Sequence, residues 1–198
     1  MRYTKAKHKL ARREGINILG KASASLDRRI NVVPGMHGKK RSRKLSEYGI
    51  QLREKQKLKR TYGLSERQFR KYAIIAQKAK ENTIDVLVQQ LETRLDNMVY
   101  RLGLGKSRAQ ARQLVSHRHV LVNGKKLNIP SYSVKIGDTV TLVEKLKNEE
   151  LKARLDELTE MPAFVEAKNA QGKLLRMPKM DDVANPVDYQ LVIEFYSR

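Results

Sequence analysis

Positive charge is concentrated in the first two thirds of this 198-residue chain, and that distribution limits what the chain can fold into and bind. Met1–Gln90 carries 24 basic and 7 acidic residues, Leu91–Lys145 carries 10 and 4, and Leu146–Arg198 carries 8 and 10, for a net charge of +21. Fixed cations at this density favour a polyanionic partner, of which nucleic acid is the commonest, with a membrane surface as the weaker alternative. The pattern therefore predicts a nucleic-acid binder whose acidic last segment faces away from the polyanion.

Several protein classes are excluded by residues that the chain lacks. Without Cys it has neither disulfides nor thiolate metal sites, and its four His show no HExxH pair and no neighbouring acidic cluster. No apolar run approaches the roughly 20 residues of a membrane span. No signal-peptide stretch follows the basic N-terminus, and Trp, typical of membrane-surface helices, is absent. We therefore expect a cytosolic protein with no metal, cofactor, membrane partner or small-molecule substrate.

The sequence nominates no catalytic residue. Gly103–Ser107 resembles the end of a phosphate-binding P-loop, but that pattern requires Gly where the chain has Tyr100, and a strand where the chain predicts a helix. No GxSxG elbow or plausible carboxylate pair is present. We expect a non-enzyme in which Gly105, Lys106 and Ser107, just before a helix N-terminus, can bind a phosphate.

Residues 1–45 predict a basic arm that becomes ordered on RNA. Met1–Lys44 holds 14 basic and 2 acidic residues and shows no sustained apolar period, so it should not fold alone. A disordered basic tail is the alternative for this composition. Val33–Gly38 contains a turn signal, because Pro presets φ and Gly tolerates positive φ, and this turn favours an arm with a defined path.

Residues 46–91 predict a helical RNA-binding domain. Helical spacing covers Ser46–Tyr62, Gly63 is a plausible C-cap, and a capping box at Ser65–Gln68 opens a second helix that ends near Lys80.

The first of these helices carries a basic ridge. Only Glu47 and Glu54 lie near enough in the sequence to neutralise it, which favours phosphate contact over a merely solvated face. Its members are Arg53, Lys55, Lys57, Lys59 and Arg60.

Residues 92–145 predict short helices beside a small sheet. The strongest helical signal in the chain runs from Thr83 to Gly103 and breaks near Thr93, where a fresh N-cap is expected. A second capping box at Ser107–Gln110 opens a further short helix.

After this helix the apolar period drops to two, which is typical of strands. Val120–Val122 and Lys125–Leu127 flank Asn123–Gly124, the strongest short hairpin signal. Val134–Leu142 alternates in the same way and is expected to continue the sheet.

Residues 146–198 predict an acidic extension that packs on this sheet. Leu146–Leu158 has the pattern of an amphipathic helix, Phe164–Leu175 that of a hairpin turning at Gln171–Gly172, and Tyr189–Tyr196 that of a last alternating strand. Acidic side chains on the outer face should meet a basic protein neighbour, in particular those of Glu157, Glu160 and Glu166.

The complete pattern predicts an α+β fold. It combines a helical, basic N-terminal domain that carries an irregular N-terminal arm with a module of short helices packed on a small, mostly antiparallel sheet.

Several strings of the chain resemble one known family. Arg94–Val140 closely resembles the S-four type RNA-binding module. The flanking strings Pro34–Gly38, Leu45–Gly63, Glu66–Tyr72 and Val192–Arg198 are similar to the fourth protein of the bacterial-type small ribosomal subunit. The resemblance covers nearly the whole chain, and several of these strings are specific to the family.

The resemblance implies a structural constituent of the small ribosomal subunit. Such a protein binds small-subunit rRNA at a multi-helix junction, nucleates assembly of the body and contributes to translational accuracy. It also lines the path by which mRNA enters the subunit, and it meets neighbouring proteins, especially the fifth and also the third and twelfth. Many members carry four zinc-binding Cys where this chain reads GKASASLDRR at Gly20–Arg29. The resemblance therefore implies no cofactor here and an arm held by RNA alone.

We predict rRNA contacts at basic, His and polar side chains in three regions. The arm supplies Arg2, Tyr3, Arg28, Arg29, His37, Lys39, Lys40, Arg41, Arg43 and Lys44. The helical domain supplies Arg53, Lys57, Arg60, Arg67, Gln68, Arg70 and Lys71. The module supplies Arg94, Arg101, Lys106, Ser107, Arg108, Arg112, Gln113, His117, Arg118, His119, Asn123 and Lys125.

Two rival functions belong to other classes. An rRNA-modifying enzyme such as a pseudouridine synthase often carries the same small module, but it needs a separate catalytic domain, of roughly a hundred residues or more. A stress or ribosome-rescue factor would borrow the module without the matching arm, helices and C-terminus. Stoichiometric presence in small subunits on a sucrose gradient would favour the ribosomal function over both.

Overall fold

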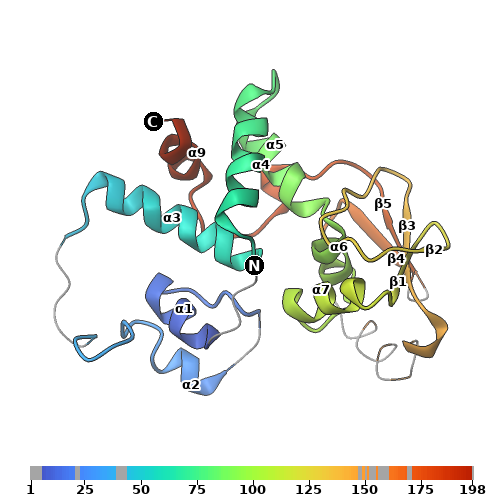
Figure 1. Ribbon diagram of the computed structural model, residues 1–198, viewed down its shortest axis with the longest axis horizontal. Coiled ribbons are helices and arrows are strands. Elements are labelled where there is room, and N and C mark those ends of the chain that lie inside the picture. Colours follow the sequence, from blue (N-terminus) through green and yellow to red (C-terminus); the bar gives the residue numbers. More distant parts are fainter. Residues whose placement is uncertain are drawn as a thin grey trace. The chain divides into compact units, whose positions relative to one another are not determined.

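The chain folds into two compact units in the computed structural model (Figure 1). The first unit combines Met1–Ile84 with Asn185–Arg198, and the second comprises Asp85–Ala184. The acidic segment expected at 146–198 is therefore divided between the two units, while the arm and the helical domain share one. The structure describes residues 6–20, 23–38, 44–146, 149, 151, 155, 161–168 and 171–197.

The described part of the first unit is helical. α9 packs on both α3 and α4, and the side chains that these helices bury include Leu58, Phe69 and Val192. The helices are α1 (Lys7–Glu14), α2 (Ala24–Asp27), α3 (Glu47–Thr61), α4 (Glu66–Lys78) and α9 (Tyr189–Ser197).

The arm is more regular than the sequence predicts. It contains α1 and α2, which bury Ala11 and Leu26 respectively, and α1 contacts α3. Short helices without an apolar stripe are unstable alone and depend on tertiary contacts, which local periodicity does not report. The expectation of an irregular arm is corrected in this respect.

The two long helices lie where the sequence predicts them. Ser46 Oγ caps α3 and Ser65 Oγ caps α4, each accepting a hydrogen bond from the backbone N–H three residues later (3.3 and 3.4 Å). Gly63, just after α3, adopts a φ of 64°, and its N–H and that of Leu64 donate to carbonyls of the last helical turn. This left-handed end directs the chain into α4.

The C-terminal segment is a helix, so the expected strand over Tyr189–Tyr196 is wrong. Asp188 Oδ1 accepts hydrogen bonds from two N–H groups of the first turn (2.9 and 3.3 Å), which is N-cap geometry. The apolar residues of this segment satisfy both a period of two and a helical period. α3 and α4 select the helix by covering Tyr189 and Val192, and α9 packs on them instead of on the sheet (Figure 1).

The second unit packs short helices on a five-stranded sheet. Its helices are α5 (Thr83–Glu92), which begins in the first unit, α6 (Leu95–Arg101), α7 (Arg108–Ser116), and the 3-10 helices η1 (Glu144–Leu146) and η2 (Met180–Asp182). All strands pair antiparallel in the order β2-β1-β3-β5-β4. They are β1 (Val120–Val122), β2 (Lys125–Lys126), β3 (Thr139–Leu142), β4 (Val165–Lys168) and β5 (Gln171–Leu174). Their shared core includes Leu95, Met98, Val99, Ala111, Val115, Val120, Val140 and Phe164.

Both predicted hairpins are present, and one of them turns elsewhere. Asn123 (φ 50°) and Gly124 (φ 77°) connect β1 to β2 with positive φ at both positions, as a type I′ turn requires. Gln171 pairs with Lys168 and Gly172 with Ala167, so both residues of the expected turn lie inside β5. The expected turn at Gln171–Gly172 is corrected accordingly.

The predicted break near Thr93 is present, but Thr93 does not cap the following helix. Its hydroxyl donates to the carbonyl of Gln89 (2.7 Å) and so closes α5. The N–H of Leu95, at the start of α6, donates to the carbonyl of Tyr132 (2.8 Å). A distant backbone segment therefore satisfies the N–H at the start of this helix, and no local signal could have shown it.

Two predicted elements are only partly represented. Of the expected strand Val134–Leu142, only Thr139–Leu142 pairs as β3. The expected helix Leu146–Leu158 lies largely outside the described residues, of which Glu149, Leu151 and Leu155 are helical.

Candidate nucleic-acid interface

The basic ridge of α3 is ion-paired within the protein, which the charge pattern of the sequence did not indicate. Three carboxylates bind all five of its cations, and two of the three come from α1 and α4. Glu14 binds Arg53 (3.3 Å) and Arg60, Glu54 binds Lys57 (2.5 Å), and Glu66 binds Lys55 (2.9 Å) and Lys59 (2.7 Å).

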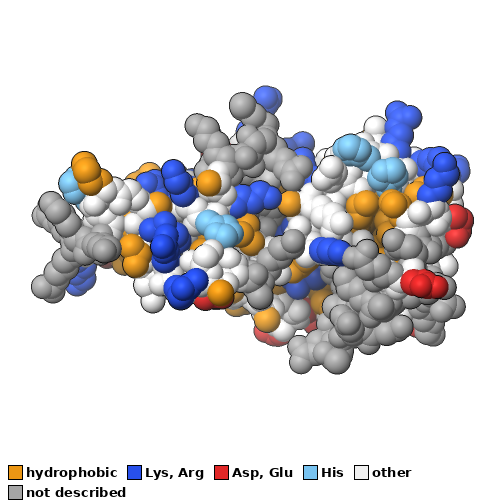
Figure 2. Space-filling view, turned by 90° about the horizontal axis from the view of Figure 1, so that it is seen from below, with side chains coloured by type: hydrophobic (Ala, Val, Ile, Leu, Met, Phe, Trp, Pro, Cys, Tyr) orange, Lys and Arg blue, Asp and Glu red, His pale blue; other side chains and the backbone are white. Residues whose placement is uncertain are grey.

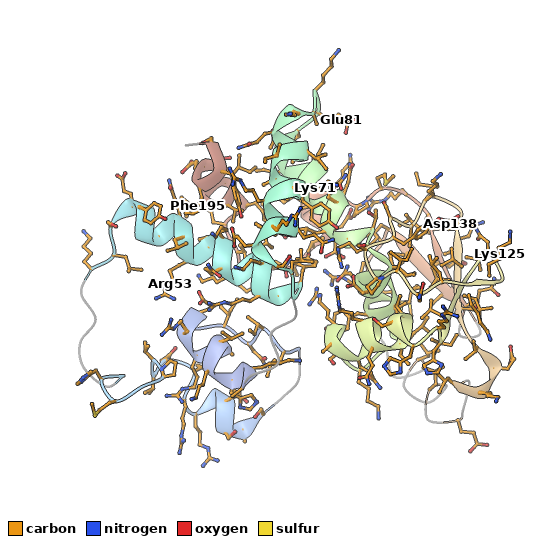
Figure 3. All side chains as sticks on the ribbon, in the orientation of Figure 1. Arg53, Lys71, Glu81, Lys125, Asp138 and Phe195 are labelled. Atoms are coloured by element: carbon orange, nitrogen blue, oxygen red, sulfur yellow. The ribbon has the colours of Figure 1, made fainter. Side chains whose placement is uncertain are left out.

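Glu14 holds the arm against α3. Its side chain is completely buried, although Arg53 and Arg60 remain partly exposed. Arg53 is drawn on the side of α3 that faces α1 (Figure 3). Removing both guanidinium partners would leave an unpaired buried carboxylate, which strongly destabilises a folded protein. These ion pairs therefore fix the position of α1. Intrachain contacts thus hold α1, so the expectation that RNA alone holds the arm does not extend to this helix.

Glu66 joins three helices of the first unit. In addition to the two lysines of α3, it accepts a hydrogen bond from the Tyr196 hydroxyl of α9 (2.7 Å). Burial raises the pKa of Glu66, but the hydrogen bonds from Lys59, Lys55 and Tyr196 outweigh burial and lower it to about 2. Burial and the bond to the Glu66 carboxylate raise the pKa of Tyr196. This corner is accordingly an ion-paired cluster with one positive charge in excess, in which Lys55 is buried and Lys59 is half-buried.

The exposed face of α4 is a cationic surface of the first unit. Arg67, Arg70 and Lys71 are exposed, and within the described residues no ion pair joins them to an acid. Lys71 is labelled in Figure 3. The opposite face of α4 is buried, so these side chains point to solvent. Gln68, predicted as a contact, donates instead to the Tyr72 hydroxyl (3.0 Å).

Arg94 is interior, which corrects its expected place on the RNA face of the module. It is 2% exposed and donates twice to Asp96 (3.0 and 2.7 Å). Asp96 also accepts from Arg112 on α7 (2.8 Å), whose side chain is 31% exposed. Arg94 therefore orients a carboxylate that in turn orients Arg112 toward the surface.

A second buried carboxylate organises the neighbouring arginines. Glu92 is fully buried and accepts two hydrogen bonds from Arg101 (2.8 and 2.7 Å) and one from Asn97 Nδ2 (2.7 Å). Asn97 Oδ1 accepts from Arg108 Nε (2.8 Å), and the Arg108 guanidinium lies 4.6 Å from the centre of the Tyr100 ring. Arg101 serves mainly this network, and Arg108 is held in one orientation at its edge.

The N-terminus of α7 uses part of its own hydrogen-bonding capacity. Ser107 Oγ accepts from Gln110 N–H (3.3 Å), and Gln110 Oε1 accepts from Lys106 N–H (2.6 Å). The predicted phosphate site at Gly105–Ser107 therefore has fewer donors than an open helix end, although the Lys106 residue is exposed.

The turn after α7 presents three predicted contacts together. Arg118 has a φ of 60°, and its N–H and that of His119 donate to Val115 and Leu114 carbonyls, so a non-glycine residue occupies the left-handed position of this helix end. His117 and Arg118 are exposed, and the rings of His117 and His119 stack 6.1 Å apart. Gln113, one turn earlier, is exposed as well.

The β1–β2 hairpin carries exposed lysines at its tip. Asn123 is committed to structure, because its amide donates to Asp138 (2.8 Å) and accepts from Thr139 N–H (2.9 Å). Lys125 and Lys126 are exposed, and Lys125 and Asp138 are labelled in Figure 3. Sequence reasoning missed Lys126, although its place beside Lys125 in a two-residue strand was a signal.

The arm contributes four predicted contacts that the structure describes. Arg28 is exposed, with its Nε bound to the carbonyl of Ala24 (3.1 Å), and Arg29, His37 and Lys44 are exposed. The other predicted arm contacts lie outside the described residues: Arg2, Tyr3, Lys39, Lys40, Arg41 and Arg43.

These surfaces can bind a polyanion through charge, ring stacking and hydrogen bonds. On the face shown in Figure 2, Lys and Arg side chains spread over the described surface, while Asp and Glu lie toward its margins. Among the described residues no three His, Asp or Glu side chains gather as a metal site would require. Within the same residues no helix combines the length and apolar character needed to cross a bilayer.

Comparisons with known proteins agree with this arrangement. Residues 2–92 match the ribosomal protein S4/S9 N-terminal domain, and residues 93–140 match the S4 domain. The chain is 47% identical to small ribosomal subunit protein uS4 of Laribacter hongkongensis over 205 aligned residues, covering 100% of this chain and 99% of the relative. Proteins of the same name from Neisseria meningitidis (47% over 205 residues) and Dictyoglomus turgidum (48% over 206) show the same coverage.

Proposed function

The chain belongs to the family of small ribosomal subunit protein uS4, and we propose that it is a structural constituent of the small ribosomal subunit in the cytoplasm that binds small-subunit rRNA directly. The observation that carries the proposal is the similarity along the full length of both chains. The exposed cations of α4, of the turn after α7 and of the β1–β2 hairpin support direct contact with RNA phosphates.

Within this role we propose that the protein docks on a multi-helix junction of the rRNA. A junction offers bent backbones and unstacked bases, which proteins recognise by shape and by stacking. Two units that each carry a cationic surface suit a target with several helices. Early docking would nucleate assembly of the body of the subunit. The protein also contributes to translational accuracy and contacts mRNA where it enters the subunit.

We further propose that the protein meets neighbouring ribosomal proteins, especially the fifth and also the third and twelfth. The acidic character of 146–198 supports protein contacts over RNA contacts for that segment. Glu166 lies in β4 and is half-buried, whereas Glu157 and Glu160 lie outside the described residues.

We propose that no zinc ion holds the arm. The chain has no Cys to bind one, so its donors do not fit the zinc site of some relatives. Other contacts order the arm: Arg12 Nε donates to the Val32 carbonyl (2.8 Å), and Glu14 binds α3.

Two measurements test the proposed function. The tagged full chain should co-sediment stoichiometrically with small subunits on a sucrose gradient. Purified chain should retain small-subunit rRNA on a filter at protein concentrations where a large-subunit rRNA fragment of the same length passes through. Sedimentation only in light fractions, together with equal retention of both RNAs, would contradict the proposal and favour one of the rival functions.

A further inference from the structure

A cationic depression of about 310 Å³ lies in the first unit, beside the turn at Val33–Gly38. Two of its sides are formed by α1 and by the turn after α2, and a residue near the end of α3 completes it. The lining residues are Lys9, Leu10, Arg13, Pro34, Gly35 and Arg60. Of these, only Arg60 belongs to the predicted RNA contacts.

Tertiary contacts hold the walls of this depression in place. Arg12 ties α1 to the turn, because its Nε donates to the Val32 carbonyl (2.8 Å) and its Nη2 to the Val33 carbonyl (3.4 Å). Gly35 adopts a φ of 115°, which strongly favours glycine. The buried Glu14 binds Arg60 and fixes its guanidinium. The depression is therefore a built feature, with both its shape and one of its cations set by buried or part-buried partners.

The lining combines positive charge with apolar surface. Lys9 and Arg13 lie one helical turn apart on α1 and are exposed, so both cations share one side of the opening. Leu10 and Pro34 are half-buried and supply flat apolar contacts. A nucleotide has the complementary chemistry, with an anionic phosphate beside a planar base, and pockets for small organic molecules begin at about 300 Å³.

We propose that this depression receives one unpaired nucleotide of the rRNA, with its phosphate on Lys9 and Arg13 and its base against Leu10, Pro34 and Arg60. The inference rests on the proposed function. It adds a site that contacts an extruded base as well as the RNA backbone. Ordinary phosphate contact at the rim would need the two cations of α1, but it would not need the apolar interior.

That difference defines the test. Leu10→Trp in the full chain fills the depression without changing charge, and Leu10→Met is the matched control that keeps its volume. We expect Leu10→Trp to weaken binding to small-subunit rRNA about tenfold or more, because the larger side chain occupies the space that the base would take, and Leu10→Met to bind as the unchanged chain does. The double variant Lys9→Ala/Arg13→Ala should weaken binding, and Lys173→Ala in β5 should not.

A measurement on the unchanged full chain keeps the inference testable if Leu10→Trp does not fold. Titration with uridine or adenosine monophosphate should shift the NMR signals of the Leu10 methyl groups and the Gly35 amide, while inorganic phosphate should leave the Leu10 methyl signals in place. Absence of any Leu10 shift with either nucleotide, or folded Leu10→Trp with unchanged rRNA affinity, would overturn the inference and leave the proposed function standing. Failure of the unchanged chain to bind small-subunit rRNA would overturn the proposed function itself.

Discussion

The Glu66 carboxylate holds two lysines of α3 that would otherwise be free to bind phosphate, and its protonation should loosen the first unit. Its folded pKa of about 2 lies below the ordinary value of 4.5, so its contribution to stability is present above pH 4.5 and is lost as pH falls toward 2. Since the side chain is 45% exposed, we expect Glu66→Gln to cost only about 1 kcal/mol at pH 7.

Urea unfolding of both proteins between pH 2 and pH 7 measures this difference. The two unfolding free energies should converge as pH falls through the range from 4.5 to 2. A difference that stays constant down to pH 2 would show that the amide perturbs packing and that the ion pairs contribute nothing.

Arg118 occupies a left-handed backbone position that glycine would occupy without strain. With a φ of 60°, it costs about 1 kcal/mol relative to Gly, so Arg118→Gly should raise the free energy of unfolding by roughly that amount. The same change removes an exposed guanidinium between two His, so rRNA binding should weaken. Thermal unfolding and filter binding on the same sample test both effects, and a variant that gains stability without losing affinity would show that Arg118 does not contact RNA.

At the scale of elements, β5 lies so close to Leu102, the residue after α6, that a Cβ at Gly172 would overlap the leucine side chain. A Cβ there would lie 2.2 Å from Cδ2 of the fully buried Leu102. We expect Gly172→Ala to destabilise the chain by about 1–3 kcal/mol through overpacking. Leu102→Val in the same chain should relieve part of that loss, so unfolding free energies in a double-mutant cycle should be less than additive. Additive losses would mean that the strand accommodates the methyl group by moving.

The elements also show how far sequence reasoning reaches. Caps and hairpins depend on local chemistry, so the start of α3 at Ser46 and the turn at Asn123–Gly124 were predictable. The helical state of α9 was not predicted, because its apolar residues fit two periods and only packing on α3 and α4 chooses between them; Asp188 was the one local signal.

The candidate site follows the same division. The cations on α4 and Lys125 of the hairpin were predicted as contacts from the sequence; they are exposed in the structure, and their contact with RNA stays a prediction. Glu14 and Glu66 reach the cations of α3 from other helices, so the charge pattern of α3 alone suggested free cations. The burial of Arg94 against Asp96 depends on the packing around them, which the charge pattern does not report.

For the whole molecule, the exposed cations without an acidic partner in the described structure should determine the salt dependence of rRNA binding. About six or more phosphate contacts should lower affinity on the order of a thousandfold between 50 and 200 mM salt. Because the α4 cations have no acidic partner in the described structure, Arg67→Ala/Arg70→Ala/Lys71→Ala should flatten the slope of log affinity against log salt by about two to three.

Lys57→Ala is the matched control from α3, since Lys57 is already bound to Glu54. Its slope should equal that of the unchanged chain. Equal slopes for all three proteins would mean that the α4 cations are merely solvated.

The return of α9 to the first unit also has a consequence for the order in which the protein can mature on the ribosome that synthesises it. Synthesis delivers α3 and α4 first and α9 last, after every residue of the second unit. The apolar surfaces around Phe69 and Leu58 therefore lack α9 until the second unit has been synthesised, and the first unit is complete only after α9 has left the exit tunnel.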